Sequence, residues 1–124
     1  MLKKEKKKEI IKNGEVMTVK TASDSNIKEI VNSPSLSMIK FGATWCPPCK
    51  ALKPTLDRIA QERSDVSIYE MDIDDNPVAP QLYRISNVPT MILFFNGSEV
   101  SRLSGNQPKT VLENWINGES ARVS

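Results

Sequence analysis

Residues 45–50 read Trp45-Cys46-Pro47-Pro48-Cys49-Lys50 and hold both cysteines of the 124-residue chain. The residues before them, 38–43, are largely apolar, which is typical of a parallel strand that is covered on both faces. After them, apolar residues recur at helical spacing: Ala51, Leu52, Leu56, Ile59 and Ala60. The cysteine pair is therefore predicted to lie where a buried strand leads into a helix.

Two prolines fix where this helix begins. A proline disfavours helical backbone angles at the residue before it, so Cys46 cannot lie inside the helix and becomes its N-cap. An N-cap side chain accepts a hydrogen bond from the amide at N2 or N3, and N2 is Pro48, which has no amide hydrogen. We therefore expect the Cys46 sulfur to accept a hydrogen bond from the Cys49 amide.

This position favours the thiolate form of Cys46. A helix N-terminus stabilises a nearby anion by about 0.3–1 kcal/mol, so we expect the pKa of the Cys46 thiol to lie below that of an ordinary cysteine. Cys49, one turn inside the helix, should remain a buried thiol. Such an asymmetric pair suits thiol–disulfide exchange. A mononuclear zinc site is not expected, because two Cys and no His cannot supply four ligands. On spacing alone, an inert buried pair stays open.

The rest of the chain continues the alternation of strands and helices. We expect a strand at 16–19, a helix capped at 23–24, a strand at 66–71 and a short helix at 77–83 with Asn76 as its cap. Strands at 90–95 and 99–103 are joined by Asn96-Gly97, a strong hairpin signal, and a last helix follows Pro108 and ends near Gly118. This order predicts a three-layer α/β/α domain around a mixed sheet of about five strands, with four helices.

Length and charge indicate a single domain with a basic N-terminal extension. Residues 1–12 hold six Lys and two Glu, a net charge of +4, so the remainder carries −2. We interpret 1–14 as a flexible extension, 15–120 as the domain and 121–124 as a C-terminal tail. No apolar run is long enough to span a bilayer, and no signal-peptide core follows the basic residues. We expect a cytoplasmic monomer that binds neither a membrane nor nucleic acid.

Over about residues 15–118 the chain resembles thioredoxins. The resemblance is carried by several motifs in order: residues 41–50 around the cysteines, Pro54 in the helix, Asp74-Asp75-Asn76-Pro77, Tyr83 to Thr90 with Val88-Pro89, the hairpin 94–97, and Gly105. A lone C-x-x-C is a weak signal, whereas several motifs with near-matching spacing are specific.

The resemblance implies a thioredoxin fold and a protein-disulfide reductase that needs no cofactor. Cys46 would attack a substrate disulfide, Cys49 would resolve the mixed disulfide, and the two would end as a redox-active disulfide. Pro89 would be cis. The residues around the sulfur would form a mostly uncharged docking surface for protein disulfides: Trp45, Pro47, Pro48, Asn87, Val88, Pro89 and Gly105. A flavoprotein thioredoxin reductase would be the electron donor.

The chain departs from the family's usual pattern in four ways. Pro-Pro replaces Gly-Pro between the cysteines, Asn87 replaces a common glycine, and Gly42 stands where a larger residue is frequent. The fourth departure concerns charge: Lys40 stands where the family places a buried Asp, and Glu70 stands where it places a Lys. We expect Lys40 and Glu70 to pair beneath the active site and to serve proton transfer at the second cysteine. The alternative is that Lys40 extends to solvent and Glu70 is exposed.

Three other functions remain open beside the reductase. The chain could be a more oxidising exchanger, although no His lies between the cysteines. It could be a binding module or assembly subunit that uses this fold without redox turnover. It could also be a dimer that bridges a metal or an iron–sulfur cluster through two C-x-x-C loops.

Overall fold

A computed structural model of the chain describes residues 18–124. Its elements, in chain order, are β1 (Lys20–Thr21), α2 (Ile27–Val31), β2 (Leu36–Gly42), α3 (Pro47–Glu62), β3 (Val66–Asp72), α4 (Ala79–Leu82), β4 (Thr90–Phe95), β5 (Ser98–Ser104) and α5 (Lys109–Val123). This order confirms the predicted alternation, the hairpin and the final helix. The predicted extension 1–14 lies outside the described residues.

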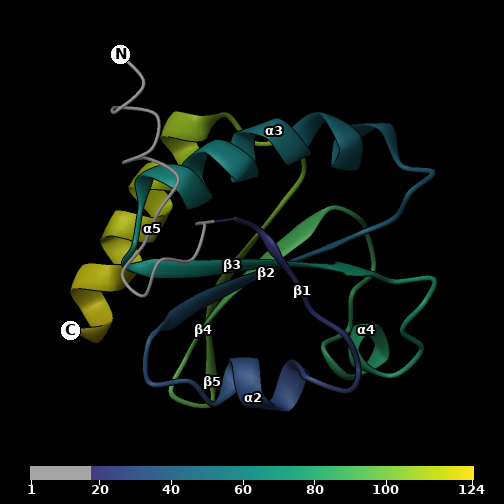
Figure 1. Ribbon diagram of the computed structural model, residues 1–124, viewed down its shortest axis with the longest axis horizontal. Coiled ribbons are helices and arrows are strands. Elements are labelled where there is room, and N and C mark those ends of the chain that lie inside the picture. The colour runs from purple at the N-terminus through teal and green to yellow at the C-terminus, as the bar shows by residue number, and fades with distance from the viewer. Residues whose placement is uncertain (1–17) are drawn as a thin grey trace.

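The five strands form one mixed sheet in the order β1-β3-β2-β4-β5. β3 pairs in parallel with β1 and β2, while β4 pairs antiparallel with β2 and β5. Helices α3 and α5 cover one face of the sheet, and α2 and α4 cover the other (Figure 1). The predicted three-layer α/β/α fold is therefore confirmed. It places β2, which leads into the cysteine pair, in the middle of the sheet.

Side chains of β2 alternate between two covered faces of the sheet, which explains why the strand is largely apolar and fully buried. Met38 packs with the helices α3 and α5, whereas Ile39 and Phe41 pack on the opposite face near α2 and α4. Every residue of β2 is buried because both faces are covered. Lys40 shares the face of Met38, at the end of the strand nearest the cysteines, and it is the only charged residue in this strand.

The hairpin between β4 and β5 turns at Asn96 and Gly97. Their φ angles are +54° and +92°, and a two-residue loop with positive φ at both positions is the turn that matches the twist of the flanking strands. The Gly97 amide donates to the carbonyl of Val31, the last residue of α2, and the Asn96 amide donates to the carbonyl of Ser33, which follows that helix. The predicted hairpin is confirmed.

Two predicted helix caps are wrong. Helix α2 starts at Ile27 with Asn26 at the N-cap position, and α4 starts at Ala79 with Val78 at that position. The Asp24 carboxylate instead accepts hydrogen bonds from the amides of Val78 and Ala79 at 3.0 and 2.8 Å. Asp24 thus accepts hydrogen bonds from the free amides at the start of α4, although it lies in a distant part of the sequence.

Element ends also differ at both ends of the described chain. The first strand lies at Lys20–Thr21, later than predicted, and residues 16 and 17 are not described. Helix α5 passes through Gly118 and ends at Val123, so most of the predicted 121–124 tail is helical. Its last turns are held by an Arg122–Glu119 ion pair at 2.8 Å and by the Ser124 hydroxyl, which donates to the Ser120 carbonyl at 2.6 Å. Within 18–124, no helix is long and apolar enough to cross a membrane.

Candidate active site

The turn from β2 into α3 holds the cysteine pair as the prolines predict. Helix α3 begins at Pro47, and Cys46 is its N-cap with extended backbone angles (φ −99°, ψ 109°). The Cys46 sulfur accepts a hydrogen bond from the Cys49 amide at 3.2 Å. Cys46 and Cys49 form a disulfide. The structure therefore shows the oxidised form of the pair, with one sulfur at the positive end of a helix.

Exposure does not distinguish the two cysteines in this form. Each is only 3% exposed, so Cys49 is buried as predicted and Cys46 is equally buried in the disulfide state. Their neighbours differ, however. The Cys46 sulfur lies 3.8 Å from the Val88 carbonyl oxygen, whereas the Cys49 sulfur faces Gly42. The Cys46 sulfur is thus the one that meets the loop before β4.

The loop before β4 contains a cis peptide bond between Val88 and Pro89, as the resemblance implied. The Thr90 hydroxyl donates to the Asn87 carbonyl at 2.7 Å, and the Gly105 amide donates to the Pro89 carbonyl at 2.8 Å. These two bonds fix the loop from both sides. Asn87 is exposed, Val88 is half-buried and Pro89 is buried. Pro47 and Pro48 are exposed across from this loop.

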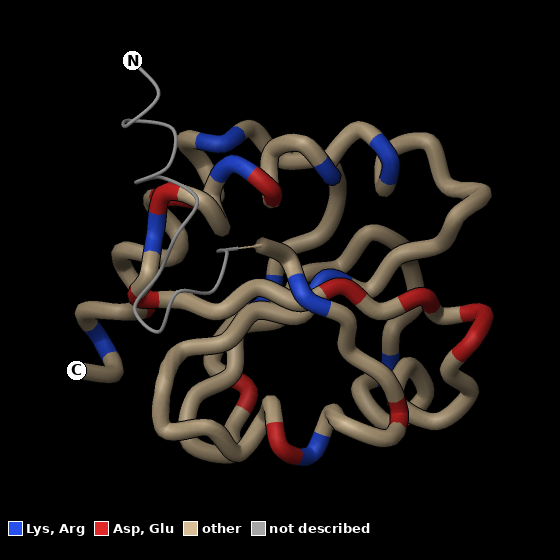
Figure 2. The backbone as a smooth tube through the Cα atoms, viewed as in Figure 1, with Lys and Arg blue, Asp and Glu red and all other residues tan. Residues whose placement is uncertain are grey.

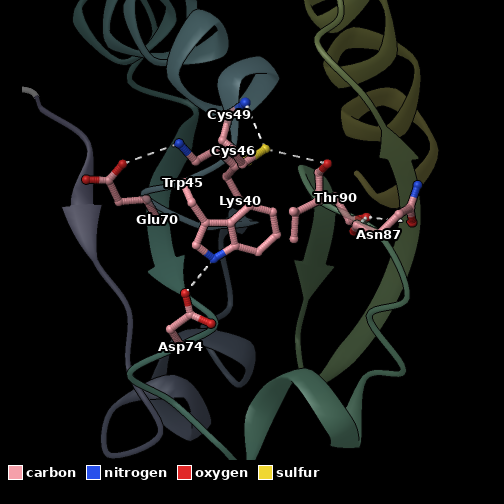
Figure 3. Close-up of a disulfide and its surroundings, with 9 residues drawn as sticks. Lys40, Trp45, Cys46, Cys49, Glu70, Asp74, Asn87 and Thr90 are labelled. Carbon is pink, nitrogen blue, oxygen red and sulfur yellow. Dashed lines mark hydrogen bonds and ion pairs between the residues drawn. A yellow bond between two sulfur atoms is a disulfide. The ribbon is translucent and has the colours of Figure 1, made fainter.

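Trp45 lies on the surface beside the disulfide. It is 63% exposed, which confirms the prediction that it is not a core residue. Its indole Nε1 donates a hydrogen bond to Asp74 Oδ2 at 2.7 Å (Figure 3). This partner was missed, because the sequence showed Asp74 only as part of a motif and gave no sign that the loop after β3 reaches Trp45.

Lys40 and Glu70 form the predicted pair. They lie opposite each other in the parallel register of β2 and β3, and Lys40 Nζ is 3.5 Å from Glu70 Oε1. The Lys40 side chain is 7% exposed and that of Glu70 is 38% exposed. The alternative in which Lys40 extends to solvent is therefore wrong. Sequence reasoning missed Lys53, whose Nζ lies 3.9 Å from the other oxygen of Glu70.

A cavity of about 340 Å³ lies against Cys49, between α3 and the edge of the sheet formed by β1 and β3. Lys40, Gly42, Lys53 and Glu70 contribute to its wall. Figure 2 shows basic positions along α3 and acidic positions along β3 and the loop that follows it. Within 18–124, no group of three or more His, Cys, Asp or Glu side chains is placed to hold a metal ion.

The sequence and the fold match known proteins. The family model described as Thioredoxin matches residues 18–118. A thioredoxin of Rickettsia prowazekii is 42% identical over 101 residues, which cover 80% of this chain and 96% of that protein. A thioredoxin of Chlamydia pneumoniae is 39% identical over 99 residues, covering 80% and 96%.

Solved structures agree. A crystal structure of thioredoxin from Malassezia sympodialis superimposes with a TM-score of 0.78 at 28% identity, covering 83% of this chain and 91% of that one. With a disulfide of C-x-x-C spacing at the start of α3, these matches support thiol–disulfide oxidoreductase activity. The chain belongs to the thioredoxin family.

Proposed function

We propose that the chain reduces disulfides in other proteins, with Cys46 as the nucleophile and Cys49 as the resolving cysteine. The Cys46 thiolate attacks one sulfur of a substrate disulfide, and the other substrate sulfur leaves as a thiolate. Cys49 then attacks Cys46, which releases the second substrate thiol and leaves the Cys46–Cys49 disulfide. Two electrons pass from the chain to the substrate.

The observation that carries this assignment is the hydrogen bond from the Cys49 amide to the Cys46 sulfur at 3.2 Å. In the reduced chain the same amide and the helix N-terminus would stabilise a thiolate at Cys46. Cys49 lies one turn inside α3, so it lacks that position. The first attack therefore belongs to Cys46, and Pro47 and Pro48 keep the turn rigid between the dithiol and disulfide forms.

The substrate would dock across the face that Cys46 shares with Trp45, Asn87 and Val88. The Val88 carbonyl lies next to the Cys46 sulfur and can accept a hydrogen bond from an extended substrate segment. Trp45 offers a large exposed aromatic surface whose orientation is fixed by Asp74. Both groups are uncharged, so docking would tolerate many protein disulfides. This surface is completed by Gly105, Pro89, Pro47 and Pro48.

Glu70 would take the proton that Cys49 must lose before it attacks Cys46. The Lys40–Glu70 pair lies beneath Cys49, because Lys40 and Gly42 share one face of β2 and Gly42 faces the Cys49 sulfur. A carboxylate in this position can accept a proton directly or through a water. The ammonium of Lys40, 3.5 Å from Glu70 Oε1, would hold this carboxylate in position for the transfer.

A flavoprotein thioredoxin reductase would return the chain to its dithiol form. This role suits a reducing compartment such as the cytoplasm, where disulfides of ordinary proteins are transient.

Reduction of insulin disulfides tests the assignment of the cysteines. We expect Cys46→Ser to lose activity by at least about 100-fold, because the attacking thiolate is gone. Cys49→Ser should form a mixed disulfide with the substrate that accumulates at Cys46 and is seen as a mass increase. Thermal unfolding of both reduced variants controls for loss of fold. Activity retained in Cys46→Ser, with Cys49 carrying the adduct, would reverse the two roles.

A single-turnover experiment tests the role of Glu70. We expect Glu70→Gln to slow the release of substrate from the mixed disulfide by about 10-fold or more and to shift that step to higher pH, while the first attack is unchanged. Glu113→Gln makes the same replacement on α5 and is the matched control. A release rate and pH profile equal to those of the parent chain would exclude the proton-transfer role.

A further inference from the structure

A group of charged side chains lies beneath the cysteine pair, and its net charge is positive. One acid, Glu70, faces two ammonium groups: Lys40 Nζ is 3.5 Å from one of its oxygens, and Lys53 Nζ is 3.9 Å from the other. Lys50 and Asp72 contribute to the wall of the adjoining cavity and add one charge of each sign. The two partners of Glu70 therefore leave this side of the disulfide with an excess of positive charge.

Lys40 is the member of this group that approaches Cys49. A Cβ atom at position 42 would lie 3.3 Å from the Cys49 sulfur and 3.4 Å from Lys40 Cε. The sulfur and this carbon, which carries the ammonium nitrogen, are therefore no further apart than those two distances together. Figure 3 shows the Lys40 ammonium on the cysteine side of the Glu70 carboxylate. The buried end of the cysteine pair thus meets a cation.

Burial lets the charge of Lys40 act on Cys49. The Lys40 side chain is 7% exposed, and Cys49 is 3% exposed. Water and salt screen an interaction between buried groups much less than one between surface groups. The side chain of Lys53 is 55% exposed, so its charge is screened more. Of the two cations that flank Glu70, Lys40 is therefore the one that influences Cys49.

We propose that the Lys40 ammonium stabilises the Cys49 thiolate, which speeds the resolving step and makes the chain a weaker reductant than it would be without this charge. This role rests on the proposed function, in which Cys49 loses its proton to Glu70 and its electron pair then forms the bond to Cys46 while the substrate sulfur leaves. A nearby cation favours the negative charge that appears on Cys49 before this attack. A larger share of Cys49 is then in the form that attacks.

The same charge shifts the balance between the disulfide and the dithiol. The disulfide has no ionisable sulfur, so the cation favours only the reduced form, and a stabilised reduced form makes the couple more oxidising. This advantage is absent where Cys49 is a neutral thiol and grows as the pH rises through the titration of Cys49. The Cys46 thiolate, which forms first, opposes that titration. The other charged groups around Cys49 come from β2, β3 and α3: Lys40, Glu70, Asp72, Lys50 and Lys53.

Exchanging the two charges separates the sign of the charge from ion pairing itself. Positions 40 and 70 lie opposite each other in the register of β2 and β3, so Lys40→Glu/Glu70→Lys retains an ion pair and places the acid at position 40. Lys40→Met removes the charge at a similar volume. Lys28→Met, which removes an exposed lysine from α2 on the other face of the sheet, is the matched control. Urea unfolding of the oxidised chains verifies that each is folded, and Lys40→Met decides alone if the exchanged chain does not fold.

Equilibration with dithiothreitol measures the redox balance. Each full chain is equilibrated with mixtures of reduced and oxidised dithiothreitol at about pH 5 and about pH 9 and quenched with acid, and its dithiol and disulfide forms are separated by chromatography. At the higher pH we expect the ratio of dithiol to disulfide to fall about threefold or more in Lys40→Met and to fall further in the exchanged chain. At the lower pH all variants should match the parent chain. Equal ratios at the higher pH, or the same change at both, would overturn the proposal.

Alkylation of Cys49 in the Cys46→Ser background tests the thiolate directly. We expect Lys40→Met to raise the pH midpoint of iodoacetamide labelling by about 0.5 or more, and Lys28→Met to leave it unchanged. In the parent background, Lys40→Met should slow the release of substrate from the mixed disulfide by about threefold at neutral pH. An unchanged midpoint would show that the ammonium does not act on Cys49. Neither the redox balance nor the labelling uses a protein substrate, so a failure here is distinct from a failure of the insulin test of the two cysteines.

Discussion

Lys40 on β2 lies directly opposite Glu70 on β3, and the two side chains meet with Nζ 3.5 Å from Oε1 immediately below the Cys49 turn. The buried partner of this pair is the cation, since the carboxylate is 38% exposed and the ammonium only 7%. The two members should therefore respond unequally to substitution.

Glu70→Gln should destabilise the oxidised chain by about 1–3 kcal/mol, because it leaves a buried ammonium without its acid. The partial exposure of Glu70 keeps this cost below that of breaking a fully buried pair. Lys40→Met should be neutral or stabilising, since a similar volume is then apolar and Glu70 can turn to solvent. Urea unfolding at pH 7 measures the free energy of unfolding of both variants. Equal costs for the two variants would show that the pair does not act through a buried charge.

The reduced chain should show different reactivity at its two cysteines. Cys46, studied in Cys49→Ser, should be alkylated with a lower pH midpoint than Cys49, studied in Cys46→Ser, because only Cys46 lies at the N-terminus of α3. The measurement is the rate of iodoacetamide labelling between pH 5 and 10. If the two midpoints coincide, the helix terminus has no part in selecting the nucleophile.

Predictions from the sequence were correct where the cause is local. Pro47 and Pro48 determine the N-cap at Cys46 through backbone sterics, and Asn96-Gly97 determines its own turn. The Lys40–Glu70 pair could be inferred because the family resemblance supplied the alignment between the two strands. These features depend on neighbours in sequence or on a known register.

The failures involve contacts between distant segments. Asp24 caps α4 by accepting hydrogen bonds from two amides that lie 54 and 55 positions later in the sequence. Asp74 and Trp45, which also form a hydrogen bond, are 29 positions apart. Nothing in the residues near Asp24 shows that it caps α4 and not α2, which is the next helix along the chain. Gly118 was taken to end α5, yet Ile116 anchors the helix in the core and ion pairing beyond Gly118 continues it. Tertiary packing there outweighs the helix propensity of one residue.

Asp74 should control the orientation of Trp45. In a Trp115→Phe background, where Trp45 is the only tryptophan, Asp74→Ala should raise the quenching of Trp45 emission by acrylamide, because the indole loses its hydrogen-bond partner. Asp74→Asn retains an oxygen that can accept this bond and is the control. Identical quenching in all three chains would mean that the bond does not hold the indole in solution.

The ion pair of Glu99 and Arg102 gives the chain an acid-sensitive contribution to stability. The hydrogen bond from Arg102 is the largest cause that lowers the pKa of Glu99 from its ordinary 4.5. Stabilisation from this group is present above about pH 4.5 and is lost as the pH falls through the lowered folded-state pKa.

Both side chains are about one-third exposed, so solvent limits this contribution to under about 1 kcal/mol. Glu99→Gln should therefore lower the urea midpoint slightly at pH 7 and converge with the parent chain near pH 3. A difference that persists unchanged at pH 3 would assign the effect to packing instead of charge.

Gly97 and Gly118 should respond in opposite directions to the same replacement by alanine. Gly97 has φ +92°, and a Cβ there would lie 3.1 Å from the Asn32 side-chain oxygen. Gly97→Ala should therefore cost about 1–2 kcal/mol. Gly118 lies within α5 and a Cβ there meets nothing within 4 Å. Gly118→Ala should stabilise the chain by about 0.5–1 kcal/mol, because alanine loses less backbone entropy in a helix. Thermal unfolding of the two variants side by side measures the contrast, and a gain in stability from Gly97→Ala would contradict the turn geometry on which the β4–β5 hairpin depends.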